Sequence, residues 1–277
     1  MNSKELFSQW QRKKEIDRYL FMPLITDFAA KIANTTYEEM TSDSSELSKT
    51  LIDCQKLFGY DGMIISFDNV IIAEALGCQV DLINKRISKK ILDAQLLESI
   101  DNVSNSPRIQ SLLTGITIVQ RVTRDQIIGA AISGMGKLGK SIIQPAEDTL
   151  KDQYDLLQKV LMNLVKAILE KRPDLFIIYE EEHDFLEETY KPILNLIKYF
   201  RISCVIITEN SVKFTLNCQN TAEVLSQTMI SDNKNYEELC VKWDEFKTKP
   251  SVLLTAGEVP INMDVDQFHD VIDVLRS

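Results

Sequence analysis

The sequence is poor in the residues that mark linkers, disordered tails and membrane anchors. Nine glycines and seven prolines are spread over 277 residues, and no glycine- or proline-rich stretch divides them. We therefore expect a single domain over residues 1–277. No apolar run approaches the roughly 20 residues that span a bilayer, and the charged start MNSKELFSQWQRKKEIDRY lacks the apolar segment of a signal peptide. These absences predict a protein that makes no membrane contact and resides in the cytoplasm.

Cysteine motifs and excess positive charge are also missing. The five cysteines are scattered with no C-x-x-C spacing, which argues against a disulfide framework and a structural zinc site: Cys54, Cys78, Cys204, Cys218 and Cys240. The formal net charge of −10 argues against a nucleic-acid partner. We expect a small-molecule ligand instead. The sequence is compatible with a homodimer and does not fix the oligomeric state.

What the sequence does have is an alternation of short apolar runs and longer amphipathic segments. Seven runs are predicted strands: 21–25, 62–67, 126–133, 175–179, 203–208, 226–231 and 251–255. Most are continuously apolar, as parallel strands covered on both faces are. Amphipathic helices between them indicate an α/β fold with a parallel sheet. On pattern alone, a closed barrel and a doubly wound sheet both remain open.

The stretch SGMGKLGKS, residues 133–141, matches two nucleotide-binding motifs. Gly134, Gly136 and Gly139 fit the dinucleotide fingerprint, and Gly134, Gly139, Lys140 and Ser141 fit the phosphate loop. Two strand–helix units precede it, however, whereas a phosphate loop usually opens its domain. We favour a tight turn that needs glycine, and nucleotide binding through 134–141 stays an alternative.

Three segments of the sequence carry a family resemblance. They are residues 22–77, which include the phrase YDGMIISFDNVIIAEALG, residues 126–198, and the closing LTAGEVPINMDVDQFHDVIDVLRS. They resemble the uroporphyrinogen decarboxylase superfamily, which also contains corrinoid-linked methyltransferases. The resemblance implies a TIM-like (β/α)8 barrel. Because seven strands are predicted where a barrel needs eight, we expect it to be shortened or distorted near residues 230–255.

The resemblance also assigns a role to Asp68. In a barrel, the C-terminal ends of the strands face the active site. Asp68 directly follows the run 62–67 and matches the aspartate with which the decarboxylases hold the pyrrole N–H groups of their substrate. The alternative is an N-cap for residues 70–76. We predict that Asp68 lines the central cavity.

Other positions depart from the decarboxylases. After the first strand the sequence reads LITDFAAK, with no arginine to hold substrate carboxylates. The family serine is replaced by Glu181 or Glu182, the family histidine by Ala256 or a neighbour, and GMGKLGKS lacks the expected tyrosine. Decarboxylation of uroporphyrinogen itself is therefore not expected.

The zinc ligands of the corrinoid-linked methyltransferases are missing as well. Their positions are Thr208, Asn210 and Gly257, none of which offers a thiolate or an imidazole. The sequence requires no cofactor.

Acidic residues are predicted at the strand ends instead. We predict catalytic roles for Asp68, Glu181, Glu182 and His183, and substrate contacts for Asp27, Gly134, Glu209 and Glu258. Two other interpretations stay open: acids that cap helix N-termini, and a magnesium or manganese site including Glu180, Glu182 and His183.

The sequence thus indicates a divergent enzyme of this superfamily that acts on a small organic molecule by decarboxylase-like (lyase) or methyltransferase-like chemistry. A non-catalytic ligand-binding barrel is the alternative.

Overall fold

A computed structural model of the chain describes residues 1–89, 103–142, 150–181, 187–208, 211–226, 229–230, 236–246 and 249–277. The strands are β1 (Leu20–Leu24), β2 (Gly62–Phe67), β3 (Gln79–Asp81), β4 (Arg86–Lys89), β5 (Ile127–Ser133), β6 (Leu175–Glu180), β7 (Ser203–Thr208), β8 (Ser211–Leu216), β9 (Glu223–Leu225) and β10 (Val252–Glu258). The helices are α1 (Ser3–Gln11), α2 (Thr26–Ile32), α3 (Tyr37–Ser42), α4 (Ser44–Phe58), α5 (Asn69–Ala75), η1 (Val103–Asn105), α7 (Pro107–Val122), α8 (Met135–Ile142), α9 (Leu150–Glu170), α10 (Glu187–Phe200), α12 (Tyr236–Phe246) and α13 (Val265–Arg276).

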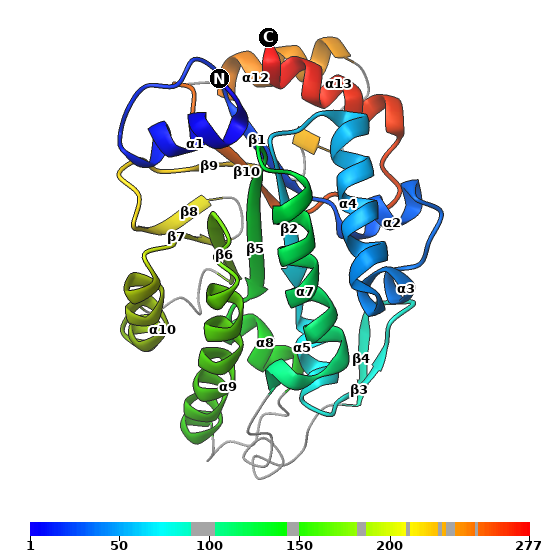
Figure 1. The fold of residues 1–277 in the computed structure, drawn as a ribbon, viewed down its shortest axis with the longest axis vertical. Helices are drawn as coiled ribbons and strands as arrows, with labels where there is room; N and C mark the ends of the chain where they lie inside the picture. Colours follow the sequence, from blue (N-terminus) through cyan, green and yellow to red (C-terminus); the bar gives the residue numbers. More distant parts are fainter. Residues whose placement is uncertain are drawn as a thin grey trace.

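Apart from the two-stranded β3–β4 hairpin, the strands among the described residues form two sheets that lie side by side, with helices outside them (Figure 1). One sheet has the order β2-β5-β6-β7-β8 and the other the order β1-β10-β9. All pairs in both sheets are parallel except β7 with β8. The sheets meet where the Asp61 amide donates to the Phe21 carbonyl at 2.8 Å, just before β2. At the other junction β8 contacts β9, and the described residues form no ladder there.

The core shows that the strands enclose a packed interior. Alternate residues of strands from both sheets pack together in one cluster, separate from the core under the helices; they include Met22, Ile64, Ala131, Ile177, Val205, Val224 and Leu254. This is the arrangement of a barrel filled by inward-pointing side chains. Leu6, Phe7 and Trp10 of α1 belong to the same cluster and cover its N-terminal end. Figure 1 shows α5, α8 and the β3–β4 hairpin at the opposite end.

Asp61 fixes the covered end. Its carboxylate accepts hydrogen bonds from the Ser3 hydroxyl at 2.7 Å, the Arg18 guanidinium at 2.6 Å and the Phe21 amide at 3.0 Å. With 6% of its side chain exposed, Asp61 joins α1, β1 and the start of β2 through these bonds, and the Arg18 side chain that pairs with it is 35% exposed. Any ligand site is therefore expected at the other end of the strands.

The predicted α/β fold with parallel strands is confirmed, and six of the seven predicted strands correspond to β1, β2, β5, β6, β7 and β10. The strand predicted at 226–231 is wrong: β9 ends at Leu225, and residues 229–230 are helical. The irregularity begins upstream of the predicted 230–255, at β8, which turns back against β7. In SVKFTL every second residue is apolar, which suits the partly exposed surface that β8 presents.

No helix among the described residues combines the length and the apolar composition needed to cross a bilayer.

Candidate functional site

Three acidic side chains meet at the C-terminal ends of β1, β2 and β10. Asp27 lies in the first turn of α2, Asp68 directly follows β2, and Glu258 is the last residue of β10. The Asp27 amide donates to Glu258 Oε1 at 2.8 Å. All three were predicted as site residues. The register of β1 and β10 brings Asp27 and Glu258 together, and β2 supplies Asp68.

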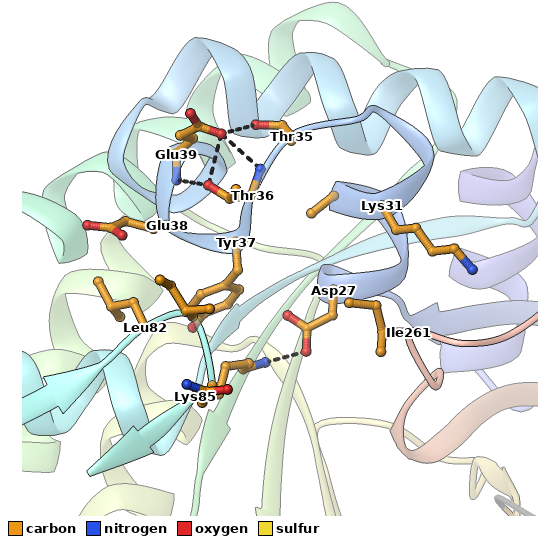
Figure 2. Close-up of a pocket in the computed structure, with 13 residues that line it drawn as sticks. Asp27, Lys31, Thr35, Thr36, Tyr37, Glu38, Glu39, Leu82, Lys85 and Ile261 are labelled. Atoms are coloured by element: carbon orange, nitrogen blue, oxygen red, sulfur yellow. Dashed lines mark hydrogen bonds and ion pairs between the residues drawn. The ribbon is translucent and has the colours of Figure 1, made fainter. Parts of the chain in front are cut away.

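Their shared partner is Lys85, which the sequence analysis did not single out. Its Nζ lies 2.8 Å from Glu258 Oε2, 3.0 Å from Asp27 Oδ2 and 3.4 Å from Asp68 Oδ2. The same atom lies 4.4 Å from the centroid of the Tyr37 ring. Figure 2 shows Asp27, Tyr37 and Lys85 converging from separate elements.

Lys85 comes from the turn of the β3–β4 hairpin, where its φ is +49°. Asp81 builds this turn by accepting hydrogen bonds from the Ile83 and Asn84 amides, both at 3.1 Å. The alternation in QVDLINKRIS indicates a hairpin outside the strand–helix repeats. Where that hairpin packs depends on tertiary contacts, which a single sequence does not show.

Asp68 both lines a cavity and caps a helix. Its Oδ1 accepts from the Val70 and Ile71 amides at 3.0 Å, which makes it the N-cap of α5. Its Oδ2 accepts from the Tyr37 hydroxyl at 2.5 Å. Burial and the neighbouring Asp68 carboxylate raise the pKa of Tyr37 well above its ordinary value, so the hydroxyl stays protonated and donates. Asp68 was predicted to line the cavity and not to cap a helix. It does line a cavity, but it also caps α5, so the second part of the prediction is wrong.

The charges at this end of the strands are strongly coupled. Burial lowers the pKa of Lys85, but Asp68, Glu258 and Asp27 together outweigh burial, and the pKa lies above that of a free lysine. Burial raises the pKa of Glu258, Lys85 lowers it, Asp27 raises it, and the net shift is upward. Lys85 therefore stays a cation, and Glu258 keeps its proton to a higher pH than a free glutamate does.

Two cavities meet at Lys85. One of about 190 Å³ lies at the strand ends and is lined by Leu24, Ser66, Asp68, Asn69, Val70, Lys85, Ile132, Ser133, Lys137, Tyr179, Gly257 and Glu258. The other, of about 700 Å³, lies between α2, α3 and the β3–β4 turn, and includes Asp27, Tyr37 and Lys85 (Figure 2). Lys85 is the residue that the two linings share.

The glycine-rich stretch 133–141 is arranged around Glu180. The Glu180 carboxylate accepts hydrogen bonds from the Gly136 and Lys137 amides, both at 2.8 Å, at the start of α8. The Tyr190 hydroxyl donates to the same carboxylate and accepts from the Met135 amide at 2.6 Å. Glu180 is 4% exposed, so a side chain of the chain itself fills the position that a phosphate takes in a nucleotide-binding loop.

Packing explains why residue 134 is a glycine. A Cβ at this position would lie 2.5 Å from Glu180 Oε2 and 2.7 Å from the Tyr190 hydroxyl, closer than side chains tolerate. Gly134 lines neither of the two cavities at this end, although it was predicted to contact substrate.

Lys85 and its three carboxylate partners, Asp27, Asp68 and Glu258, are here called the Lys85 cluster. Glu181 is not part of it. Its exposed carboxylate pairs with Lys140 at 2.5 Å. The other predicted site residues, Glu182, His183 and Glu209, lie outside the described residues.

The described residues also bear on the two metal hypotheses. Both oxygens of Glu180 are engaged by amides and Tyr190, which leaves this carboxylate a poor ligand for magnesium or manganese. At the zinc positions that the resemblance implies, Thr208 is fully buried and its hydroxyl has no hydrogen-bond partner among the described residues, and Gly257 has no side chain. These residues do not fit a zinc ion. Asn210 lies outside the described residues. Within the described part of the chain, no group of three His, Cys, Asp or Glu side chains has an arrangement that would hold a metal.

Comparison with known proteins identifies the family. The model of the family Uroporphyrinogen decarboxylase (URO-D) matches residues 2–171. The chain belongs to this family. The matched part includes β1, β2, β5 and the residues Asp27, Asp68 and Lys85. The resemblance predicted from YDGMIISFDNVIIAEALG is thus confirmed.

Solved structures extend the likeness over the remaining residues. A methyltransferase from Methanosarcina mazei aligns over 99% of this chain and 98% of its own, with 11% identity and a TM-score of 0.75. A B12-independent methionine synthase from Shewanella sp. W3-18-1, in complex with selenomethionine, aligns over 83% of this chain and 86% of its own, with 10% identity and a TM-score of 0.51. At these identities the likeness shows the fold. A search of curated proteins found no match.

Proposed function

We propose that this divergent family member is an enzyme that acts on a small neutral or cationic molecule at the C-terminal ends of the strands, with Glu258 transferring a proton. The observation that carries the proposal is the position of Glu258. It lines the cavity of about 190 Å³ together with Asp68 and Lys85, and its pKa is raised by burial and by Asp27. A carboxyl group whose pKa moves toward neutrality is a better general acid or base.

The neighbouring residues would bind and orient the substrate. Lys85 stays protonated because its pKa is raised, so it pairs with the three carboxylates and does not act as a nucleophile, which would need a free amine. The backbone amides occupy Asp68 Oδ1, so a substrate donor would approach Oδ2, which accepts from the Tyr37 hydroxyl and lies a long 3.4 Å from Lys85 Nζ. Three carboxylates around one ammonium leave the cluster acidic overall, which favours neutral or cationic substrates.

Glu258 suits either reaction of the family. In a decarboxylation it would protonate the carbon that carried the lost carboxylate. In a methyl transfer it would remove the proton from the accepting group. Family membership supports both classes, and the release of carbon dioxide or the appearance of a methylated product distinguishes them.

One observation favours a non-catalytic ligand-binding barrel as the second candidate. Lys85 donates hydrogen bonds to Asp27 and Glu258, and Tyr37 donates one to Asp68, so the carboxylates are bonded by side chains of the chain itself. Such a barrel would bind the same molecules and leave them unchanged.

The test is a screen followed by a matched pair of variants. Small amines, amides, thiols and carboxylic acids that raise the melting temperature are incubated with the protein, and products are identified by mass spectrometry. Glu258→Gln should lower turnover by about 10²- to 10⁴-fold, the usual contribution of general acid–base catalysis. Glu15→Gln is the control, because Glu15 is exposed and pairs with Lys249 at the covered end. Turnover by Glu258→Gln equal to that of Glu15→Gln would refute the assignment.

A further inference from the structure

We propose that Asp27, Asp68, Glu258 and Tyr37, here called the ammonium site, bind the primary ammonium group of an organic ligand, and that Lys85 occupies this site until the ligand displaces it. The inference rests on the proposed function and narrows its substrate class.

The ammonium site has the composition that a primary ammonium requires. Such a group has three donors, and Nζ of Lys85 meets one carboxylate from α2, one from the start of α5 and one from the end of β10. The Tyr37 ring covers the same nitrogen at 4.4 Å. An aromatic face and carboxylates together are a recurrent arrangement for organic cations.

The ammonium site also retains unused acceptor capacity. Asp27 Oδ1 is buried and has no hydrogen-bond partner among the described residues, although Oδ2 of the same carboxylate pairs with Lys85. A buried carboxylate oxygen without a donor is costly. A ligand donor that enters when Lys85 leaves would remove that cost, which Lys85 does not.

The larger cavity determines the rest of the ligand. It has a volume of about 700 Å³ and begins at Asp27, Tyr37 and Lys85 (Figure 2). Ala30, Leu82 and Ile261 give it an apolar wall, and Glu38 and Glu39 lie farther along. Lys31 is directed to the Met263 carbonyl at 3.2 Å. These features favour a short alkyl chain behind the ammonium and disfavour a carboxylate there.

Lys85 is suited to the role of a displaceable occupant. It reaches the ammonium site from a hairpin turn that lies outside the strand–helix repeats, and 22% of its side chain is exposed. Because its stem is long and flexible, it can leave the carboxylates while the hairpin stays in place.

The experiment removes the occupant and supplies the ammonium from solution. Lys85→Ala is titrated with methyl-, butyl- and hexylammonium, and with butanol and hexanol as neutral analogues, by calorimetry and thermal denaturation. At about ten times the Kd, an alkylammonium should raise Tm by about 2–5 °C. Affinity should rise about three- to fourfold for each methylene buried in the cavity. The alcohols should have no effect, and the unmodified protein should bind hexylammonium at least tenfold more weakly, because Lys85 competes.

Two further variants sharpen the result. Lys249→Ala, which removes an exposed lysine paired with Glu15 at the covered end, should behave as the unmodified protein. Asp27→Asn combined with Lys85→Ala should lose most of the gained affinity. Equal binding of hexanol and hexylammonium by Lys85→Ala, or no binding of either, would overturn the proposal.

A folding defect also gives a readout. If Lys85→Ala does not fold alone, it and Lys85→Met are refolded with hexylammonium present. Recovery of the native circular dichroism spectrum supports the ammonium site, and failure of both variants overturns it. If the ammonium binds but no candidate is turned over, the enzymatic proposal fails separately. If Glu258→Gln abolishes turnover of a substrate that carries no ammonium, only the present inference fails.

Discussion

At the scale of residues, the pKa of Glu258 depends on its charged neighbours in the Lys85 cluster. Asp27 raises the pKa of Glu258 and Lys85 lowers it, while burial raises it. The two neighbours therefore shift the pKa of Glu258 in opposite directions. Replacing either one changes the pH at which the proton leaves.

We expect Asp27→Asn and Lys85→Met to move this titration in opposite directions. Asp27→Asn removes a negative neighbour, so the pKa of Glu258 should fall toward the ordinary glutamate value of about 4.3. Lys85→Met removes the positive neighbour, so the pKa should rise further. Carbon-13 NMR of labelled glutamate side chains, with the Glu258 signal assigned from Glu258→Gln, measures both. Shifts of the same sign would show that Lys85 and Asp27 do not act through their charges.

Asp68 has a capping role and a binding role that substitution can separate. Asparagine caps a helix about as well as aspartate, whereas alanine at an N-cap costs about 1–2 kcal/mol of stability. Asp68→Asn should therefore leave the free energy of unfolding nearly unchanged and still slow turnover, because the negative charge is lost. Asp68→Ala should lower both. Urea denaturation and initial rates on the same preparations check this, and full activity of Asp68→Asn would reduce Asp68 to a cap.

At the scale of elements, Glu180 at the end of β6 holds the start of α8 by accepting hydrogen bonds from its amides. Glu180→Ala would leave the Gly136 and Lys137 amides without their buried acceptor, at a cost of about 2–4 kcal/mol for lost charge-assisted bonds. Glu181→Ala removes an exposed pair with Lys140 and should cost under about 1 kcal/mol.

Nucleotide binding tests whether Glu180 occupies the phosphate position at the start of α8. Because Glu180 fills the start of α8, ATP, GTP and NAD should not change the melting temperature, and Lys140→Ala should make no difference to that result. A nucleotide-specific rise abolished by Lys140→Ala would restore the phosphate-loop interpretation of residues 134–141.

The sequence predicts the strands that are buried on both faces. β1, β2, β5, β6, β7 and β10 each contain a run of mostly apolar, buried residues, so composition alone locates them. β8 was missed because part of its surface is exposed.

The residues of the candidate site also divide into those that the sequence predicts and those that it does not. Asp68 directly follows β2, Asp27 lies in the first turn of the helix after β1, and Glu258 ends β10, so their proximity is predictable from the barrel. Lys85 and Tyr37 reach them through the packing of a hairpin and of α3, and Glu180 meets Gly136 across 44 residues of chain. No local pattern reports such contacts.

At the scale of the whole molecule, the distribution of charge argues against the substrate after which the family is named. Uroporphyrinogen carries eight carboxylates, and a like-charge contact at about 4 Å costs about 4 kcal/mol at an effective dielectric near 20. Lys85 is already shared by three carboxylates, and Lys140 is paired with Glu181. The purified protein, incubated with uroporphyrinogen under reducing conditions, should release no partly decarboxylated porphyrinogen. Steady formation of coproporphyrinogen would show that these acids face away from the substrate.

The pairing of β1 with β10 has a consequence for how the chain is made. Leu20 pairs with Val252 and Leu24 with Glu258, so a strand near the start of the chain waits for one near its end. At synthesis rates of about 5–20 residues per second, the wait on the ribosome lasts roughly 10–50 s. During that time the apolar run LFMPL has no partner on its β10 side, and it is a natural target for chaperones that hold nascent chains.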